Sequence, residues 1–143
     1  PLHGRYDAIF NLFTSFGYFN QETTNIVVLE NFKKALHPGG HIVVDFLNLE
    51  KVVQEMIPEE QVTKKEIDFV IRRSVSENFI IKEIEVRHEN IVHHYMEKVQ
   101  ALDLDKMKYF AKTAGLKIEH IFGDYELNPF EKSRSERLIL VLQ

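Results

Sequence analysis

Two apolar segments on either side of one helix-length stretch limit what this chain can fold into more than any other feature of its sequence. Residues 6–13 (YDAIFNLF) and 41–47 (HIVVDFL) are nearly continuous apolar runs. Such runs are typical of strands that are buried on both faces of a parallel sheet. Apolar residues recur at helical spacing between them, at Ile26, Leu29, Phe32 and Leu36. The sequence therefore predicts two parallel, doubly buried strands joined by a helix in a right-handed crossover.

Local signals mark both ends of the predicted helix. Asn20 is a suitable N-cap, and Glu22 would then lie in the first turn, where the helix dipole favours a negative charge. The helix should stop at residues 37–40 (HPGG), because proline cannot continue a helix and glycine tolerates positive φ. The second strand is then expected to begin at His41.

The middle of the chain has a different periodicity. Between about residues 62 and 102, apolar and polar residues alternate, as in residues 67–72 and 80–87. Period two with one polar face indicates antiparallel strands that cover something on one side. With turns near residues 76–78 and 89–90, this segment predicts a three-stranded meander. The charged pairs Glu59-Glu60 and Lys64-Lys65 are interpreted as ordinary loop surface.

The last forty residues predict a helix followed by two strands. Asp103 or Asp105 would cap the helix, and Gly115 would end it. Its inner positions are expected to be Met107, Phe110, Ala111 and Ala114. The strands cover residues 116–122 and 136–142, and the helix-free connection between them favours antiparallel neighbours.

Composition narrows the class of protein. A chain of 143 residues suits one domain with one core, and a formal charge of −4 argues against a nucleic-acid-binding module. No apolar run is long enough to span a membrane. Cysteine is absent, which excludes disulfides and thiolate catalysis and is compatible with a cytoplasmic location.

The order of these elements resembles the C-terminal half of a class I S-adenosylmethionine-dependent methyltransferase of the small-molecule type. The matching segments are residues 6–9 (YDAI), 11–19 (NLFTSFGYF), 36–45 (LHPGGHIVVD), 113–116 (TAGL) and 137–141 (RLILV). The resemblance implies an α/β fold, with a partial Rossmann-like sheet of strands 4-5-7-6 whose last strand is antiparallel. The middle meander corresponds to the substrate-covering insert that many members carry after strand 5.

The resemblance also implies an incomplete cofactor site. In this family a glycine-rich loop after strand 1 and an acidic residue after strand 2 bind S-adenosylmethionine, and the chain contains neither. Gly39 and Gly40 lie in a helix-to-strand turn, whereas a cofactor loop must follow a strand and open a helix. Residues 1–143 are therefore expected to form a single, incomplete methyltransferase domain that binds the cofactor weakly or not at all by itself.

The resemblance places the site at the carboxyl ends of the first two strands. The cofactor would contact the segment after the first strand, which comprises Asn11, Leu12, Phe13, Thr14 and Ser15. Substrate would contact Tyr18, Asp45 and Asn48. No residue is assigned as the general base, and Tyr18 is a candidate by its position alone. In a purely structural interpretation, the aromatic residues of this loop are core side chains, and the two polar residues cap a buried strand.

Other polar clusters have weaker functional interpretations. His93 and His94 point to opposite faces of a regular strand and cannot share one metal ion, so no metal site is expected there, with or without His88. Arg72, Arg73 and Arg87 would meet an acidic substrate or form a solvated face, and we favour the solvated face. Arg137 would pair with substrate or with Asp124, or would have a structural role.

The predicted function is methyl transfer from S-adenosylmethionine to a small-molecule acceptor. Such catalysis depends mainly on positioning and desolvation. The alternative is a non-catalytic fragment that forms a homodimer through the exposed edge of strand 6–13, because uncovered apolar edges recruit partners. A third interpretation, a ligand-binding α+β module with the meander as a lid, does not account for the Leu-x-Pro-Gly-Gly turn.

Overall fold

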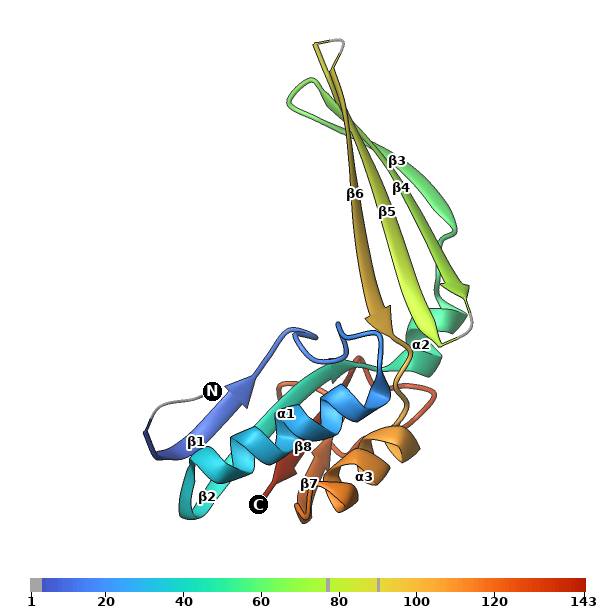
Figure 1. Cartoon of the computed structure of the whole chain (residues 1–143). Coiled ribbons are helices and arrows are strands. Elements are labelled where there is room, and N and C mark those ends of the chain that lie inside the picture. The colour runs from blue at the N-terminus through green and yellow to red at the C-terminus, as the bar shows by residue number, and fades with distance from the viewer. Residues whose placement is uncertain (1–3, 77, 90) are drawn as a thin grey trace.

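The computed structural model describes residues 4–76, 78–89 and 91–143, which form two four-stranded sheets and three helices. Glu77 and Asn90, at the tips of two predicted turns, lie outside the described residues. The elements in chain order are β1 Tyr6–Asn11, α1 Glu22–Ala35, β2 Leu36–Leu47, α2 Leu49–Gln54, β3 Glu59–Lys64, β4 Ile67–Ser76, β5 Phe79–His88, β6 Ile91–Gln100, α3 Leu104–Thr113, β7 Ile118–Phe122 and β8 Arg137–Leu142. Figure 1 shows a body that contains β1, β2, β7 and β8, and an arm that contains β3 to β6.

The predicted strand–helix–strand unit is present, and β1 and β2 are parallel. The helix begins one residue later than predicted, because Gln21 and not Asn20 is its N-cap, and no side chain caps it. It ends at Ala35, so the glycine-rich turn that follows belongs to an early extension of β2.

The prediction of burial on both faces is wrong for β1, whereas most of β2 from Gly40 onward is buried or half-buried. The body sheet has the order β1-β2-β8-β7, so β1 is an edge strand, and Phe10 is 64% exposed. Helices α1 and α3 pack side by side on one face of the sheet (Figure 1). On the opposite face, Phe10 lies beside Val43 and Val43 beside Val141, in a row that no described helix covers.

The C-terminal elements follow the sequence prediction closely. The side chain of Asp103 accepts a hydrogen bond from the N–H of Lys106 and caps α3. Gly115 has φ +71° after the last turn. β8 runs antiparallel to both β2 and β7. The core between the sheet and the two long helices is built from fully buried side chains, including Ile42, Phe46, Phe110, Leu138 and Leu140.

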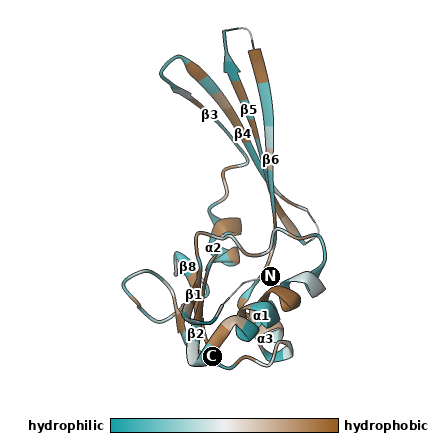
Figure 2. Ribbon diagram, turned by 60° about the vertical axis from the view of Figure 1, so that its left-hand side comes forward, coloured by the Kyte–Doolittle hydropathy of each residue, from teal (hydrophilic) through white to brown (hydrophobic). Residues whose placement is uncertain are grey.

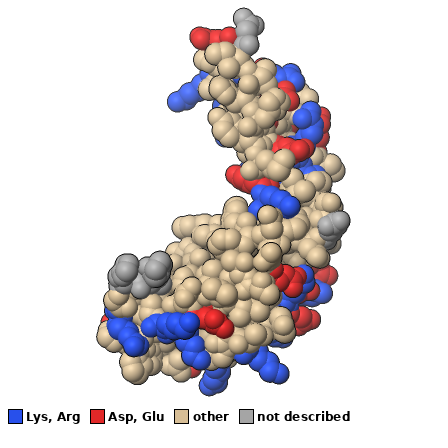
Figure 3. Space-filling model, viewed as in Figure 1, with Lys and Arg blue, Asp and Glu red and all other residues tan. Residues whose placement is uncertain are grey.

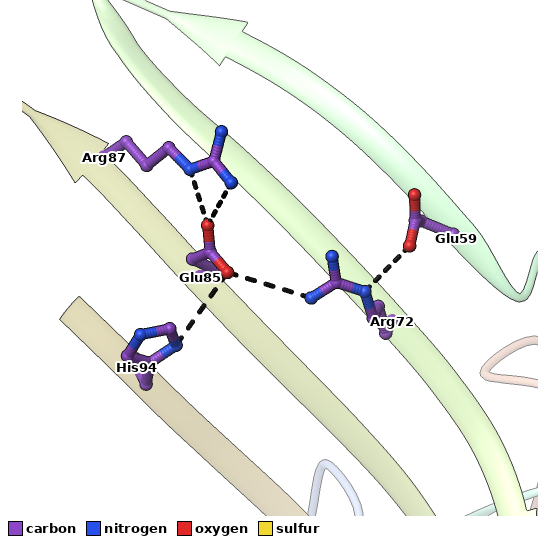
Figure 4. A network of polar contacts seen from close by, with 5 residues as sticks. All are labelled: Glu59, Arg72, Glu85, Arg87 and His94. Carbon is purple, nitrogen blue, oxygen red and sulfur yellow. Dashed lines mark hydrogen bonds and ion pairs between the residues drawn. The ribbon is translucent and has the colours of Figure 1, made fainter. Parts of the chain in front are cut away.

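The arm contains four antiparallel strands, not the three that were predicted. The additional strand is β3, which pairs with β4 along its whole length and includes Glu59, Glu60 and Lys64, three of the four charged residues interpreted as loop. Directly paired side chains point to the same face, so Phe69 and Val86 share one face, which is apolar. The opposite face carries the charged network of Figure 4, in which Glu85 contacts Arg72, Arg87 and His94. The hydropathy colours of Figure 2 show apolar and polar residues alternating along these strands.

None of the helices in the described residues is long and apolar enough to cross a membrane.

Candidate functional site

The loop after β1 has an unusual backbone. Phe13 and Thr14 both lie in the left-handed region, with φ of +57° and +59°. Residues other than glycine lose about 1–2 kcal/mol in this conformation, so the surrounding contacts must hold the loop in place. The N–H and hydroxyl groups of Ser15 both donate to the carbonyl oxygen of Leu12 and close the loop into a turn.

The buried carboxylate of Asp45, on the adjacent strand β2, provides the contacts that hold this loop. Its Oδ2 accepts hydrogen bonds from the N–H of Phe13 at 2.8 Å and from the hydroxyl of Tyr125 at 2.9 Å. Its Oδ1 accepts from Nε of Arg137 at 2.7 Å. The backbone carbonyl of Asp45 accepts from the N–H of Thr14 at 3.1 Å. Since the side chain of Asp45 is only 1% exposed, these bonds are shielded from water.

Arg137 joins the loop to the last strand of the sheet. Its Nη2 donates to the hydroxyl of Thr14 at 3.0 Å while its Nε is bonded to Asp45. Of the three roles considered from the sequence, pairing with Asp124 is wrong, because Asp124 accepts hydrogen bonds from Asn128 instead. Those bonds lower the pKa of Asp124.

Tyr125 is a polar residue of the site that the sequence analysis did not single out. Desolvation of its hydroxyl and the hydrogen bond to Asp45 raise the pKa of Tyr125 above its usual value. The phenol is therefore protonated at neutral pH and acts as a hydrogen-bond donor. Tyr125 and Arg137 lie 80 and 92 residues from Asp45 in the sequence. Only the predicted adjacency of the last strand and the second strand indicated that residues from the end of the chain could lie near Asp45.

A cavity of about 560 Å³ opens beside this loop, between body and arm. Phe13, Thr14 and Tyr18 line it from the loop, and Arg137 from β8. Helix α2 and the near ends of β4, β5 and β6 form the remaining walls. The space-filling view shows the molecule hollowed on one side at this junction, where charged side chains of both signs gather (Figure 3).

The cations that line the cavity already have acidic partners. Arg73 contacts Glu60 at 3.2 Å, and Lys82 contacts Glu97 at 3.4 Å. The rest of the arm's contribution is apolar and includes Ile80, which is 9% exposed. The cavity therefore presents apolar surface, and the charged side chains in its walls are paired.

Five of the residues singled out from the sequence divide into three groups. Phe13, Thr14 and Tyr18 line the cavity, and Tyr18 is 53% exposed. Asp45 lies behind the loop and contacts it from within the protein. Asn48 is elsewhere: its side-chain nitrogen donates to the carbonyl oxygens of Lys132 and Ser135, beside a second cavity of about 510 Å³.

The aromatic residues near the loop also have different positions. Phe16 is 3% exposed and belongs to the core, whereas Phe13 is 76% and Phe19 is 48% exposed. The buried side chain of Gln100 fixes this stretch, because its Nε2 donates to the carbonyl oxygen of Phe19. The N–H of Gln100 also donates to the carbonyl oxygen of Gly17.

The sequence matches no family model and no curated protein. Its structure does match solved proteins. An S-adenosylmethionine-dependent methyltransferase from Clostridium acetobutylicum superposes with a TM-score of 0.85 at 16% identity, over 100% of this chain and 60% of that one. The CcbJ methyltransferase from Streptomyces caelestis gives 0.83 at 18% identity, over 99% and 58%.

The fold is a methyltransferase fold. A third match, an amino pentose methyltransferase from Micromonospora echinaspora solved with bound S-adenosylmethionine, has a TM-score of 0.68 at 14% identity over 99% of this chain and 59% of that one. At these identities the likeness concerns the methyltransferase fold alone. The chain spans about 60% of the length of the methyltransferases that it matches.

Proposed function

We propose that this chain forms the C-terminal half of an S-adenosylmethionine-dependent methyltransferase that acts on a small-molecule acceptor. One observation supports this proposal above the others: the whole chain superposes on methyltransferases, and a braced loop at the carboxyl ends of its parallel strands borders a cavity. Ligands of open α/β sheets bind at such strand ends. In family terms, β1, β2, β8 and β7 would be strands 4-5-7-6, and the arm would be the insert that follows strand 5.

The residues of the β1 loop fit a cofactor with donor groups. Asn11, at the end of β1, has a buried side-chain oxygen with no hydrogen-bond partner among the described residues. A buried acceptor without a donor costs about 1–3 kcal/mol, so a donor from outside these residues is expected to reach it. The ammonium group of the cofactor's methionine part is one such donor. We propose that residues 11–15 hold this end of S-adenosylmethionine.

The uncovered face of the body sheet also supports an incomplete domain. Phe10, Val43 and Val141 form an apolar row that the described helices leave open. Near-continuous apolar strands normally have both faces covered. We propose that further protein covers this face and supplies the glycine-rich wall of the cofactor site, and that residues 1–143 are one incomplete domain with the arm as its insert. A cytoplasmic location remains a proposal that depends on the lack of cysteine.

In the complete site, S-adenosylmethionine supplies the methyl group that is transferred. The chain's own residues orient and enclose the acceptor. Asp45 and Arg137 fix the loop, and the apolar walls around Ile80 exclude water from the acceptor. Tyr18 lines the same cavity, and its hydroxyl is the group we propose to contact the acceptor. We assign Asp45 the role of a positioning residue.

A second candidate function follows from the exposed edge of β1. An apolar edge strand with Phe10 64% exposed can pair with a strand of another copy. In that case the chain would be a self-associating, non-catalytic fragment. The second candidate predicts a dimer that does not bind S-adenosylmethionine.

Saturation-transfer NMR with S-adenosylmethionine tests the proposal. We expect binding with a Kd of about 1 mM or weaker, because the chain provides one wall of the site. Phe13→Asp should abolish the signal, whereas Tyr109→Asp, which changes an aromatic residue 58% exposed on α3, should preserve it. Equal transfer in the two variants would contradict the proposed position of the site, and a dimer without any transfer would favour the second candidate.

A further inference from the structure

The outer edge of the arm is a long, apolar strand that faces solvent. β6 pairs with β5 on one side, and within the described chain no strand pairs with its other side. Ten consecutive pairs join β5 to β6 without a register shift, so β6 is a regular strand over its whole length. Residues 91–98 are all exposed, and four of them are large and apolar: Ile91, Val92, Tyr95 and Met96.

The opposite edge of the arm differs in each respect. β3 has only six residues and follows Pro58. Its ends carry Glu59, Glu60 and Lys64. Short length, proline and charge are the features that keep edge strands from pairing with other chains. β6 has none of these protections along residues 91–96, although its unpaired backbone groups face solvent.

We propose that β6 pairs antiparallel with β6 of a second copy, around a two-fold axis at Tyr95. In this register Tyr95 lies opposite its own copy, and His93 lies opposite the partner's Glu97. On the other face, Val92 lies opposite the partner's Lys98, and His94 opposite the partner's Met96. The tyrosine pair and the two histidine–glutamate pairs are favourable cross-strand contacts, and no like charges are opposed.

The neighbouring registers are less favourable. An axis at Met96 places His94 opposite the partner's Lys98, and an axis at His94 opposes that histidine to its own copy. Both registers bring groups of like charge together when histidine is protonated. The axis at Tyr95 is therefore the one that the sequence of β6 favours.

The pairing would also join the two apolar faces. A two-fold axis between antiparallel strands is perpendicular to the sheet, so the same face of each copy continues across the axis. The apolar face with Phe69, Ile71 and Ile84 then extends over eight strands. Glu97 lines the cavity, so the partner's His93 would lie at its rim. This inference does not depend on the proposed function, because neither cofactor nor acceptor enters the argument.

The paired segment is short, which sets the expected affinity. Residues 92–98 extend over about 24 Å at the rise of an antiparallel strand. A single strand pair buries less than the roughly 1,600 Å² of a standard interface. We therefore expect a dimer with a Kd in the micromolar range, largely formed at about 500 µM.

Sedimentation equilibrium of edge variants tests the proposal. Tyr95→Lys places like charges on the axis and should raise the dimer Kd about tenfold or more. Gln61→Lys on β3 and Phe10→Lys on β1 alter two of the three other sheet edges and should leave the Kd unchanged. Mixing Tyr95→Lys with Tyr95→Glu should restore a dimer, because opposite charges then meet at the axis.

Four results would overturn the proposal. One is an unmodified chain that remains monomeric at about 500 µM, and another is an open-ended series of oligomers. The third is a dimer that Phe10→Lys or Gln61→Lys disrupts while Tyr95→Lys does not. The fourth is a failure of the two Tyr95 variants to pair with each other when circular dichroism shows that both are folded.

Discussion

At the scale of single residues, the carboxylate of Asp45 connects the fold to the proposed function. It accepts hydrogen bonds from the loop after β1, from β8 and from the segment before β8. A buried carboxylate is stable only when charged or polar partners surround it. The same contacts hold Phe13 and Thr14 in a backbone conformation that they would not adopt alone. The same hydrogen bonds thus stabilise the buried carboxylate and fix the shape of the loop.

Arg137→Ala tests this role of Asp45. Removing the guanidinium leaves a buried carboxylate without its cation, so the free energy of unfolding should fall by about 3 kcal/mol. Chemical denaturation measures the change, and the amide signals of Phe13 and Thr14 should broaden. Arg134→Ala removes a cation from the same region whose side chain is 80% exposed, and it should cost less than about 0.5 kcal/mol. Equal losses for the two variants would contradict the account.

Glu85, on the charged face of the arm, should make the stability of the folded state depend on pH. The hydrogen bond and charge of Arg87, with smaller contributions from His94 and Arg72, lower the pKa of Glu85 below its usual value of 4.5 (Figure 4). A carboxylate with a lowered pKa stabilises the folded state above its unfolded pKa and loses that contribution as the pH falls through its folded pKa.

Thermal unfolding of Glu85→Gln measures this contribution. The variant should melt below the unmodified chain at pH 7, and the two melting temperatures should converge as the pH falls through the lowered pKa of Glu85, which lies below 4.5. Glu126→Gln, which alters an exposed carboxylate in the last loop, should melt with the unmodified chain at both pH values. A Glu85→Gln deficit that persists unchanged at low pH would contradict the assignment.

The sequence predicted the residues of the site that are near one another along the chain. Phe13 and Thr14 follow a strand, and Asp45 lies near the end of the next one, so their proximity followed from the strand–helix–strand pattern. Arg137 and Tyr125 come from the end of the chain, and only the packing of β8 against β2 brings them to Asp45. No local periodicity carries that information.

At the scale of elements, the glycine-rich start of β2 determines how closely β1 can approach. A Cβ atom added at Gly40 would lie 3.0 Å from the carbonyl oxygen of Asp7 and 3.1 Å from that of Tyr6. These atoms belong to β1, where the register with β2 shifts between Tyr6 and Ala8. Gly39 has φ +83° but open space around it. Gly40 therefore allows β1 to approach closely, whereas Gly39 allows a backbone conformation with positive φ.

Hydrogen exchange of Gly40→Ala and Gly39→Ala separates the two purposes. Gly40→Ala should push β1 away from β2, cost about 1–3 kcal/mol and increase exchange of the β1 amides. Gly39→Ala should lower the free energy of unfolding by about 1–2 kcal/mol, because position 39 has positive φ. The exchange protection of the β1 amides, compared with that of the β2 amides, should not change. Unaltered β1 protection in Gly40→Ala would show that the strands do not depend on this contact.

Long periodic elements were predicted and short charged ones were not. α3 matched its predicted cap, its inner positions and its glycine stop. β3 was missed because its sequence, EEQVTK, contains one large apolar residue, and strand pairing with β4 overrides that weak pattern. The six-residue helix α2 was missed for a similar reason, since it is too short to show a helical period.

At the scale of the whole molecule, the body carries the core and the arm projects from it (Figure 1). The sheet of the arm has little helical cover, whereas β2 and β8 are buried against α1 and α3. Exchange protection should therefore be highest in β2 and β8 and lowest in β3. Mass-spectrometric hydrogen exchange measures this order. Equal protection of β3 and β8 would show that arm and body unfold as one unit.

The central claim is that the loop after β1 binds S-adenosylmethionine. Two-dimensional amide NMR during titration with this cofactor tests the claim most directly. The account predicts shifts that are confined to the loop after β1, at Phe13, Thr14 and Ser15, and at Tyr18 further along the same loop. The far ends of β4 and β5, and Asn48 beside the second cavity, should not move. Shifts centred on either of those regions, with the loop unperturbed, would contradict the account.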